Sequence, residues 1–145
     1  PEQWYKVINN NLNSVFHVTS KVLQEMLKNQ YGRIINISSI NGQKGQFGQT
    51  NYCAAKAGIH GFTKALAQEV AKKGITVNTI SPGYVRTGML EKVNPEILDG
   101  IIKQIPIGRL AEPNEIARSV TFLAETASGY ITGANLSING GQYMS

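Results

Sequence analysis

Apolar side chains recur at spacings of three and four along the first thirty residues, which is the pattern of an amphipathic helix. Proline at the start and Tyr31-Gly32 after the last turn match the residue preferences of helix ends. We therefore place this helix from Glu2 to about Gln30. Three poor helix formers, Asn9–Asn11, fall in its middle, where polar residues on a solvent-facing side are tolerated.

Downstream, short β-branched runs alternate with helical patterns. The runs predict strands at Arg33–Ser38, Ile75–Ser81 and Asn135–Ile138, and the amphipathic stretches predict helices at 50–73, 94–104 and 112–125. The first strand is apolar almost throughout, which is typical of a parallel strand covered on both faces. A glycine- and glutamine-rich loop is expected from Gly42 to Gly48. This alternation indicates the α/β class.

The predicted helix from Thr50 to Lys73 has two distinct faces. One is apolar and should face the core, and it consists of Ala55, Ile59, Phe62, Leu66 and Val70. Nearly opposite runs a row of small residues, Ala54, Gly58, Gly61 and Ala65. A glycine inside a helix costs about 1 kcal/mol relative to alanine, and close approach of another backbone would explain why two are present. We expect a helix–helix interface along this row, between subunits.

Composition narrows the class of protein. The chain has 145 residues, of which 41% are hydrophobic and 16% charged, so one globular domain is expected. The net charge is +5, but the Lys and Arg residues are scattered along the chain rather than gathered into a stripe with aromatic residues, which argues against nucleic-acid binding. The positive charge still favours anionic substrates or cofactors. No stretch reads as a signal peptide or as about 18 consecutive apolar residues, so no membrane span is predicted.

The single cysteine, Cys53, excludes an internal disulfide and fits a reducing, cytoplasmic location. Packing is the favoured role for its side chain, because the sequence places no histidine near it. His17 and His60 have no partners at metal-ligand spacing, so no metal site is predicted. The chain begins Pro1-Glu2 rather than with methionine, and we expect it to be part of a longer protein.

Three side chains suggest a site for carbonyl chemistry. Tyr52 and Lys56 stand four residues apart on one helix face, and Ser39 ends the preceding predicted strand. A phenol is a weak acid near neutral pH, and a nearby ammonium favours its ionised form, which suits general acid–base catalysis. A serine hydroxyl can stabilise charge on the same substrate oxygen. Such a site interconverts a ketone and an alcohol if a hydride is supplied, although Y-x-x-x-K alone also occurs as an ordinary helix pair.

The order of three motifs resembles the short-chain dehydrogenase/reductase family: G-R-I-I-N-I-S-S, then N-Y-C-A-A-K-A-G, then V-N-T-I-S-P-G-Y-V-R-T. Within that family, the stretch N-G-Q-K-G-Q-F-G-Q-T-N-Y looks most like the reductases of 3-oxoacyl thioesters, especially of acetoacetyl-CoA. The resemblance covers nearly all of residues 1–145, but only about the C-terminal half of a family member. It implies the C-terminal catalytic half of one doubly wound, parallel-sheet Rossmann domain, without its dinucleotide-binding N-terminal half. Gly42, Gly45 and Gly48 do not replace the missing phosphate-binding loop.

The same resemblance assigns roles to individual residues. Asn11 would complete a catalytic tetrad with Ser39, Tyr52 and Lys56, holding a water against the lysine where the helix bends locally. Tyr52 and Lys56 would also contact the cofactor, together with Pro82, Gly83, Val85 and Thr87 of the loop after the second strand. The substrate would meet Gln46, Phe47, Gln49 and Tyr84. Relatives usually carry an acidic residue at the position of Gly88, which puts the rigidity of the cofactor loop in doubt.

The resemblance implies NADPH-dependent reduction of a 3-oxoacyl thioester, acetoacetyl-CoA by preference, to the (3R)-hydroxyacyl thioester. Use of NAD is not excluded, because the residues that select the cofactor lie outside this chain. Acyl carrier protein in place of coenzyme A is one alternative, and a sugar, steroid or polyol substrate is another. A non-catalytic chain serving only assembly is a third. Family members form homodimers and homotetramers, and residues 94–104 would form a lid over the site.

Overall fold

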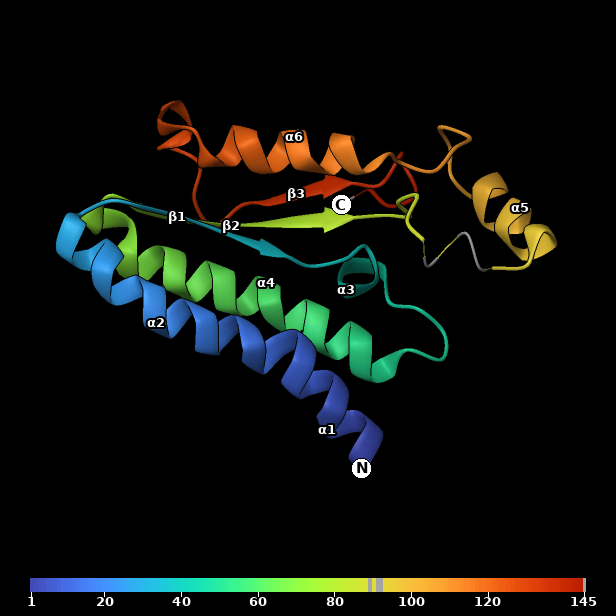
Figure 1. Ribbon diagram of the computed structural model, residues 1–145, viewed down its shortest axis with the longest axis horizontal. Coiled ribbons are helices and arrows are strands. Elements are labelled where there is room, and N and C mark those ends of the chain that lie inside the picture. Colours follow the sequence, from blue (N-terminus) through green and yellow to red (C-terminus); the bar gives the residue numbers. More distant parts are fainter. Residues whose placement is uncertain (89, 91–92, 145) are drawn as a thin grey trace.

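The computed structural model describes residues 1–88, 90 and 93–144, which fold as a small parallel sheet with helices on both faces (Figure 1). The helices are α1 (Glu2–Ile8), α2 (Ser14–Asn29), α3 (Asn41–Lys44), α4 (Thr50–Val70), α5 (Pro95–Lys103) and α6 (Pro113–Ala124). The strands are β1 (Gly32–Ile37), β2 (Ile75–Pro82) and β3 (Asn135–Ile138). A π-helical segment, η1 (Asn9–Asn13), joins α1 to α2, and short 3₁₀ turns, η2 (Ala71–Lys73) and η4 (Thr126–Ser128), follow α4 and α6.

The three strands are all parallel and lie in the order β1-β2-β3. Gly32 pairs with Ile75 at one end of the sheet, and Ile37 pairs with Ile80 at the other. α2 and α4 cover one face, whereas α6 lies across the opposite face (Figure 1). The predicted α/β class is therefore confirmed, and each predicted strand is present with bounds that differ by at most one residue.

Burial differs between the strands because of their places in the sheet. Every residue of β2 from Ile75 to Ser81 is buried, as expected for a central strand with helices on both sides. In β1 buried residues alternate with less buried ones, and Ile37 is 44% exposed. Helices contact both faces of β1, α2 on one and α6 on the other, as predicted, and its weaker burial reflects its place at the edge of the described sheet.

A buried polar cluster ties β1, α4 and β2 together. The Asn36 amide donates to the Thr63 hydroxyl oxygen at 2.9 Å, and the Thr79 hydroxyl lies 2.9 Å from the same oxygen. All three residues are at least nine-tenths buried. Buried polar groups are costly unless they are hydrogen-bonded, so this cluster fixes how the helix sits on the two strands.

One residue in the row of small residues on α4 packs against the same chain rather than against another subunit. A β-carbon at Gly58 would lie 2.9 Å from the Leu12 side chain, so this glycine allows η1 of the same chain to pack against α4. Ala54, Gly61 and Ala65 are exposed, and nothing in the described chain lies within 4 Å of a β-carbon built at Gly61. The interface at Gly58 is therefore internal to the chain.

The predicted loop from Gly42 to Gly48 is partly helical. The Asn41 backbone N–H donates to the Ser39 hydroxyl oxygen at 3.1 Å, and the next N–H groups bond to the carbonyls of Ser39 and Ile40. A β-carbon at Gly42 would lie 2.7 Å from the carbonyl carbon of Lys56, so the glycine lets this short turn, α3, rest on the α4 backbone. The Ser39 hydroxyl and the close contact at Gly42 thus stabilise a helical turn where the composition of the segment predicts a loop.

Candidate active site

Ser39 and Tyr52 lie in one pocket at the carboxyl ends of β1 and β2. The other residues that line this pocket are Ile40, Asn41, Gln49, Gly83, Tyr84, Val85, Thr87 and Leu90. The Ile40 N–H donates to the Pro82 carbonyl at 2.9 Å and holds the two segments that follow the strands side by side. The pocket sits where ligands bind in open α/β sheets, in the crevice beyond the strand ends.

Ser39 is oriented by the backbone that follows it. Its oxygen accepts a hydrogen bond from the Asn41 N–H at 3.1 Å. A serine hydroxyl has one proton and two lone pairs, so this contact uses an acceptor site and leaves the proton available. Ser39 can therefore donate to an oxygen placed in the pocket.

Lys56 follows Tyr52 by one turn on α4. Its ammonium donates to the Ile37 carbonyl at 3.0 Å and lies 5.6 Å from the centre of the Tyr52 ring. Partial burial lowers the pKa of the Lys56 ammonium from its ordinary value. One of the three ammonium donors is used by β1, so the others remain for the phenol, a water or a ligand hydroxyl.

Asn11 lies in the π-helical segment η1, where the helix departs from α geometry at the three asparagines. Its amide donates to the Val7 carbonyl at 3.1 Å. Asn11 and Lys56 line a common groove between α2 and β1, while Ser39 and Tyr52 line the pocket at the strand ends. Lys56 thus shares a groove with Asn11 while its ammonium lies 5.6 Å from the Tyr52 ring, and the role of Asn11 in holding a water there stays a prediction.

The loop after β2 offers a pair of backbone groups to the pocket. Val85 forms a parallel bridge with Ala111, in which the Arg86 N–H donates to the Ala111 carbonyl at 2.8 Å and the Ala111 N–H donates to the Tyr84 carbonyl at 3.0 Å. This pattern turns the N–H and C=O of Val85 away from Ala111, and no residue of the described chain bonds to them. An amide ligand such as a carboxamide, with one donor and one acceptor, matches such a pair.

Asn41 also lines this pocket. Its side-chain nitrogen donates to the Gln49 side-chain oxygen at 3.0 Å, whereas its own side-chain oxygen is buried with no partner among the described residues. Sequence reasoning missed Asn41, since an asparagine after a strand carries no signal of its own. The backbone pair of Val85 therefore carries the fit to a ligand that can both donate and accept hydrogen bonds.

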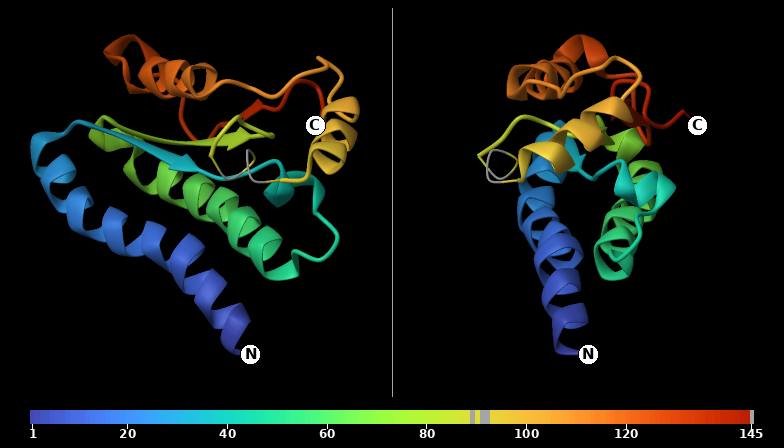
Figure 2. Two further views of the ribbon diagram at one scale, coloured as in Figure 1. Left: turned by 45° about the vertical axis from the view of Figure 1, so that its right-hand side comes forward. Right: turned by 90° about the vertical axis from the view of Figure 1, so that its right-hand side faces the viewer.

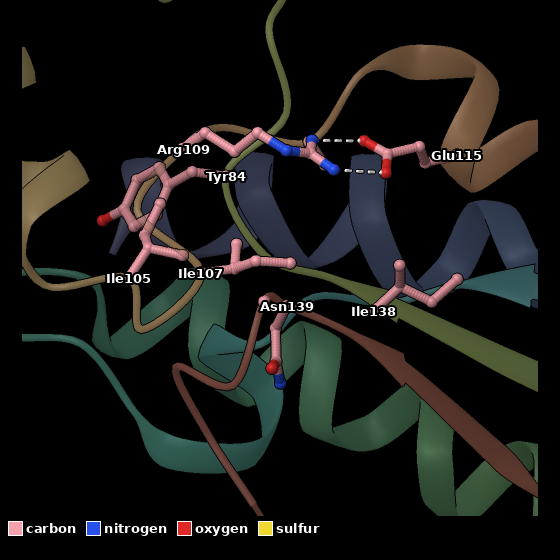
Figure 3. A pocket seen from close by; sticks show the side chains of 9 residues that line it. Tyr84, Ile105, Ile107, Arg109, Glu115, Ile138 and Asn139 are labelled. Atoms are coloured by element: carbon pink, nitrogen blue, oxygen red, sulfur yellow. Dashed lines mark hydrogen bonds and ion pairs between the residues drawn. The ribbon is translucent and has the colours of Figure 1, made fainter.

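The segment 105–111 supports the loop after β2 (Figure 3). Tyr84 lines the pocket described above and also a second cavity of about 150 Å³ walled by Ile105, Ile107 and Ile138. Above this cavity, Arg109 donates two hydrogen bonds to the Glu115 carboxylate, at 2.7 and 2.8 Å. These bonds, with a third from the Glu112 N–H, lower the pKa of Glu115 to about 2. The ion pair fixes the start of α6 next to Ala111, the residue that bridges to Val85.

The structure separates the other proposed substrate residues. Gln49 and Tyr84 line the pocket with Ser39. Gln46 is half-buried outside it, and Phe47 is fully exposed on the same loop. A contact of Gln46 or Phe47 with substrate therefore stays a prediction.

Over residues 1–88, 90 and 93–144, no three side chains of His, Cys, Asp or Glu converge as metal ligands would. In the same residues no helix combines the length and the apolar character needed to cross a membrane.

Comparison with known proteins defines the class to which this site belongs. Residues 1–143 match the family model described as enoyl-(acyl carrier protein) reductase, which is part of the short-chain dehydrogenase/reductase family. The chain therefore belongs to the short-chain dehydrogenase/reductase family, and this membership implies a nicotinamide cofactor.

Individual relatives are more specific. The chain is 62% identical to the acetoacetyl-CoA reductase of Allochromatium vinosum and 56% identical to that of Cupriavidus necator; each alignment covers 97% of this chain and 57% of the relative. It is 51% identical to the 3-oxoacyl-[acyl-carrier-protein] reductase FabG of Haemophilus influenzae, over 99% of this chain and 60% of that protein. The chain thus spans somewhat more than half the length of these relatives.

Proposed function

We propose that the protein containing this chain reduces a 3-oxoacyl thioester, acetoacetyl-CoA by preference, to the (3R)-hydroxyacyl thioester with NADPH. The observation that carries the proposal is the convergence of Ser39, Tyr52 and Val85 on one pocket, with the Lys56 ammonium behind the phenol. The three relatives named above support carbonyl rather than enoyl reduction, because each is named for a 3-oxoacyl substrate.

The side chains divide the work of carbonyl reduction between them. Ser39 donates its free hydroxyl proton to the carbonyl oxygen and holds it beside Tyr52. Tyr52 gives that oxygen its proton as general acid. Lys56 stabilises the phenolate that remains, and water held near Asn11 restores the proton. Each role belongs to a different side chain, so each can be removed singly by substitution.

A bound nicotinamide cofactor supplies the hydride. Val85 would hold its carboxamide through the backbone N–H and C=O, and Lys56 would hold the ribose with its free donors. Pro82, Gly83 and Thr87 shape the same loop, with Gly83 so close to Asn139 that a β-carbon would lie 2.9 Å from the Asn139 α-carbon. The choice of NADPH over NADH is part of the proposal.

Substituting proline for Val85 tests the backbone contact. Proline lacks the N–H, and one lost hydrogen bond of about 1 kcal/mol raises the dissociation constant of NADPH about fivefold to tenfold. Val85→Ala is the matched control, since it removes the side chain and keeps the N–H, and its affinity should stay within about twofold of wild type. Titration of NADPH fluorescence measures both, and equal affinities for the two variants would contradict a backbone contact.

The substrate is proposed to enter beneath α5. This helix lies beyond the carboxyl ends of the strands, at the same end of the sheet as α3 (Figure 2). Its N-cap is Asn94, whose side chain accepts from the Glu96 N–H at 2.8 Å. A short capped helix above a pocket is suited to act as a lid. The exposed ring of Phe47 would gain an apolar partner in the acyl-thioester.

The substrate assignment is tested by following NADPH consumption with the full-length protein that contains this chain. Acetoacetyl-CoA and the same acyl group on acyl carrier protein are compared side by side, and we expect kcat/KM to favour coenzyme A. Preference for the carrier protein would instead indicate the substrate for which FabG is named. Cofactor binding without turnover of either substrate would contradict the proposed substrate class.

Self-association is the second part of the proposal. The exposed small residues Ala54, Gly61 and Ala65 lie on one face of α4, and Trp4 and Phe16 are 43% and 55% exposed on the neighbouring helices. Small and apolar side chains allow close helix packing between subunits. We propose a homodimer or homotetramer assembled through this face.

A further inference from the structure

Lys56 is tied to the end of β1 by two of its own atoms. Its ammonium donates to the Ile37 carbonyl at 3.0 Å, and its backbone carbonyl accepts from the Ser38 hydroxyl at 2.8 Å. Ile37 and Ser38 are the two residues that precede Ser39. These bonds therefore set the position of Lys56, on α4, relative to Ser39, at the end of the strand.

His60, one turn after Lys56 on α4, contacts the same Ser38 hydroxyl. Its Nε2 atom lies 3.0 Å from the Ser38 oxygen. The Ser38 proton is directed to the Lys56 carbonyl, so the Ser38 oxygen acts as acceptor toward His60. The ring must then carry a proton on Nε2. Burial, and to a smaller extent the charge of Lys64, lower the pKa of His60, which keeps the ring neutral near pH 7 with this single N–H.

The packing around this chain of contacts is tight. Ser38 is only 4% exposed, and the Gly42 backbone rests against the carbonyl carbon of Lys56 and the nitrogen of Ala57. α3 and Ser38 thus both contact the α4 backbone at Lys56. A change at His60 reaches Lys56 through one intervening hydroxyl.

We infer that His60 is a positioning residue, which acts through Ser38 to hold Lys56 at the end of β1. His60 lies outside the pocket that holds Ser39 and Tyr52. The inference rests on the proposed function for its kinetic readout, while the hydrogen bond itself is observable without turnover.

Leucine and glutamine at position 60 separate positioning from packing. His60→Leu keeps side-chain volume and loses the donor, whereas His60→Gln keeps an N–H donor. We expect His60→Leu to lower kcat for acetoacetyl-CoA about tenfold with KM within about twofold, because displacement of catalytic groups affects mainly the chemical step. His60→Gln should retain at least about half of kcat. His17→Leu, at the exposed histidine of α2, is the matched control and should behave as wild type.

A double-mutant cycle and NMR complete the test. Ser38→Ala should lower kcat at least as much as His60→Leu, since it also removes the bond to the Lys56 carbonyl, and the double variant should be no slower than Ser38→Ala, because His60 acts through the Ser38 hydroxyl. In the free protein, ¹⁵N NMR should show the Nε2–H tautomer of His60 and a changed Nε2 resonance in Ser38→Ala. Three results would each overturn the inference. The first is that the losses in kcat of the two single variants add in the double variant. The others are a His60→Leu variant with a lower melting temperature but unchanged kcat, and an Nδ1–H tautomer of His60. Absence of turnover in the wild type would contradict the proposed function instead, and the NMR result would then decide whether the Ser38–His60 contact exists.

Discussion

Replacing Tyr52 with phenylalanine is expected to lower kcat about 10³-fold, since general acid–base groups contribute about 10²–10⁴-fold. The substitution removes a single oxygen from a half-buried ring in the pocket shared with Ser39. Ser39 would still hold the carbonyl oxygen, but no proton donor would remain in the position of the phenol. The ring itself stays 5.6 Å from the Lys56 ammonium, so the wall of the site is preserved.

The affinity for NADPH separates loss of chemistry from loss of structure in this variant. The proposed cofactor contacts of Val85 and Lys56 remain in this variant and only the one expected from the Tyr52 phenol is lost, so the dissociation constant should rise by no more than about fivefold. Stopped-flow reduction of acetoacetyl-CoA and fluorescence titration of NADPH give the two quantities. Tyr130→Phe is a suitable control, because this tyrosine is fully exposed. Tyr52→Phe turnover above about a tenth of wild type would contradict the assignment of the general acid.

Local sequence patterns predicted the elements of this fold well because the elements depend on local signals. β3 has the predicted bounds Asn135–Ile138. α6 begins at Pro113 with a capping box between Glu112 and Glu115, and α5 begins after Asn94. Caps and prolines act within one turn of the helix, so they can be read from adjacent residues.

Features that depend on distant segments were not predictable in the same way. The small side chain at Gly58 reads as a helix interface, but only the fold shows that its partner is Leu12 rather than another subunit. Val85 gains its free backbone pair from Ala111, which lies 26 residues further along the chain. The Ser38–His60 contact joins a strand end to a helix, and neither residue type indicates it. Ser39, Tyr52 and Lys56 could be proposed from the sequence because the order of the motifs around them resembles a known family, and the structure places Ser39 and Tyr52 in one pocket.

The largest effect on stability is expected at Thr63, which is buried far from the pocket. Thr63→Val keeps the shape of the side chain and removes the oxygen that Asn36 and Thr79 both contact at 2.9 Å. Two buried polar groups then lose their partner, so the free energy of unfolding should fall by about 2–4 kcal/mol. For a domain of this size that corresponds to a melting temperature lower by roughly 7–13 °C. Urea unfolding followed by circular dichroism measures the difference.

The pattern of double variants shows whether unsatisfied polar groups cause the loss. Thr79→Val added to Thr63→Val removes one of the two stranded partners, so the pair should be less destabilised than the sum of the single variants. Thr121→Val on α6 is the matched control, because its exposed hydroxyl donates to the Ala117 carbonyl, at 3.2 Å, and its effect should stay within about 0.5 kcal/mol. Strict additivity at Thr63 and Thr79 would attribute the loss to packing. Because Ser39 follows β1 and Tyr52 and Lys56 lie on α4, a strand–helix register held by Asn36, Thr63 and Thr79 also sets the geometry of the catalytic groups, and kcat should fall in Thr63→Val even at temperatures where the variant is fully folded.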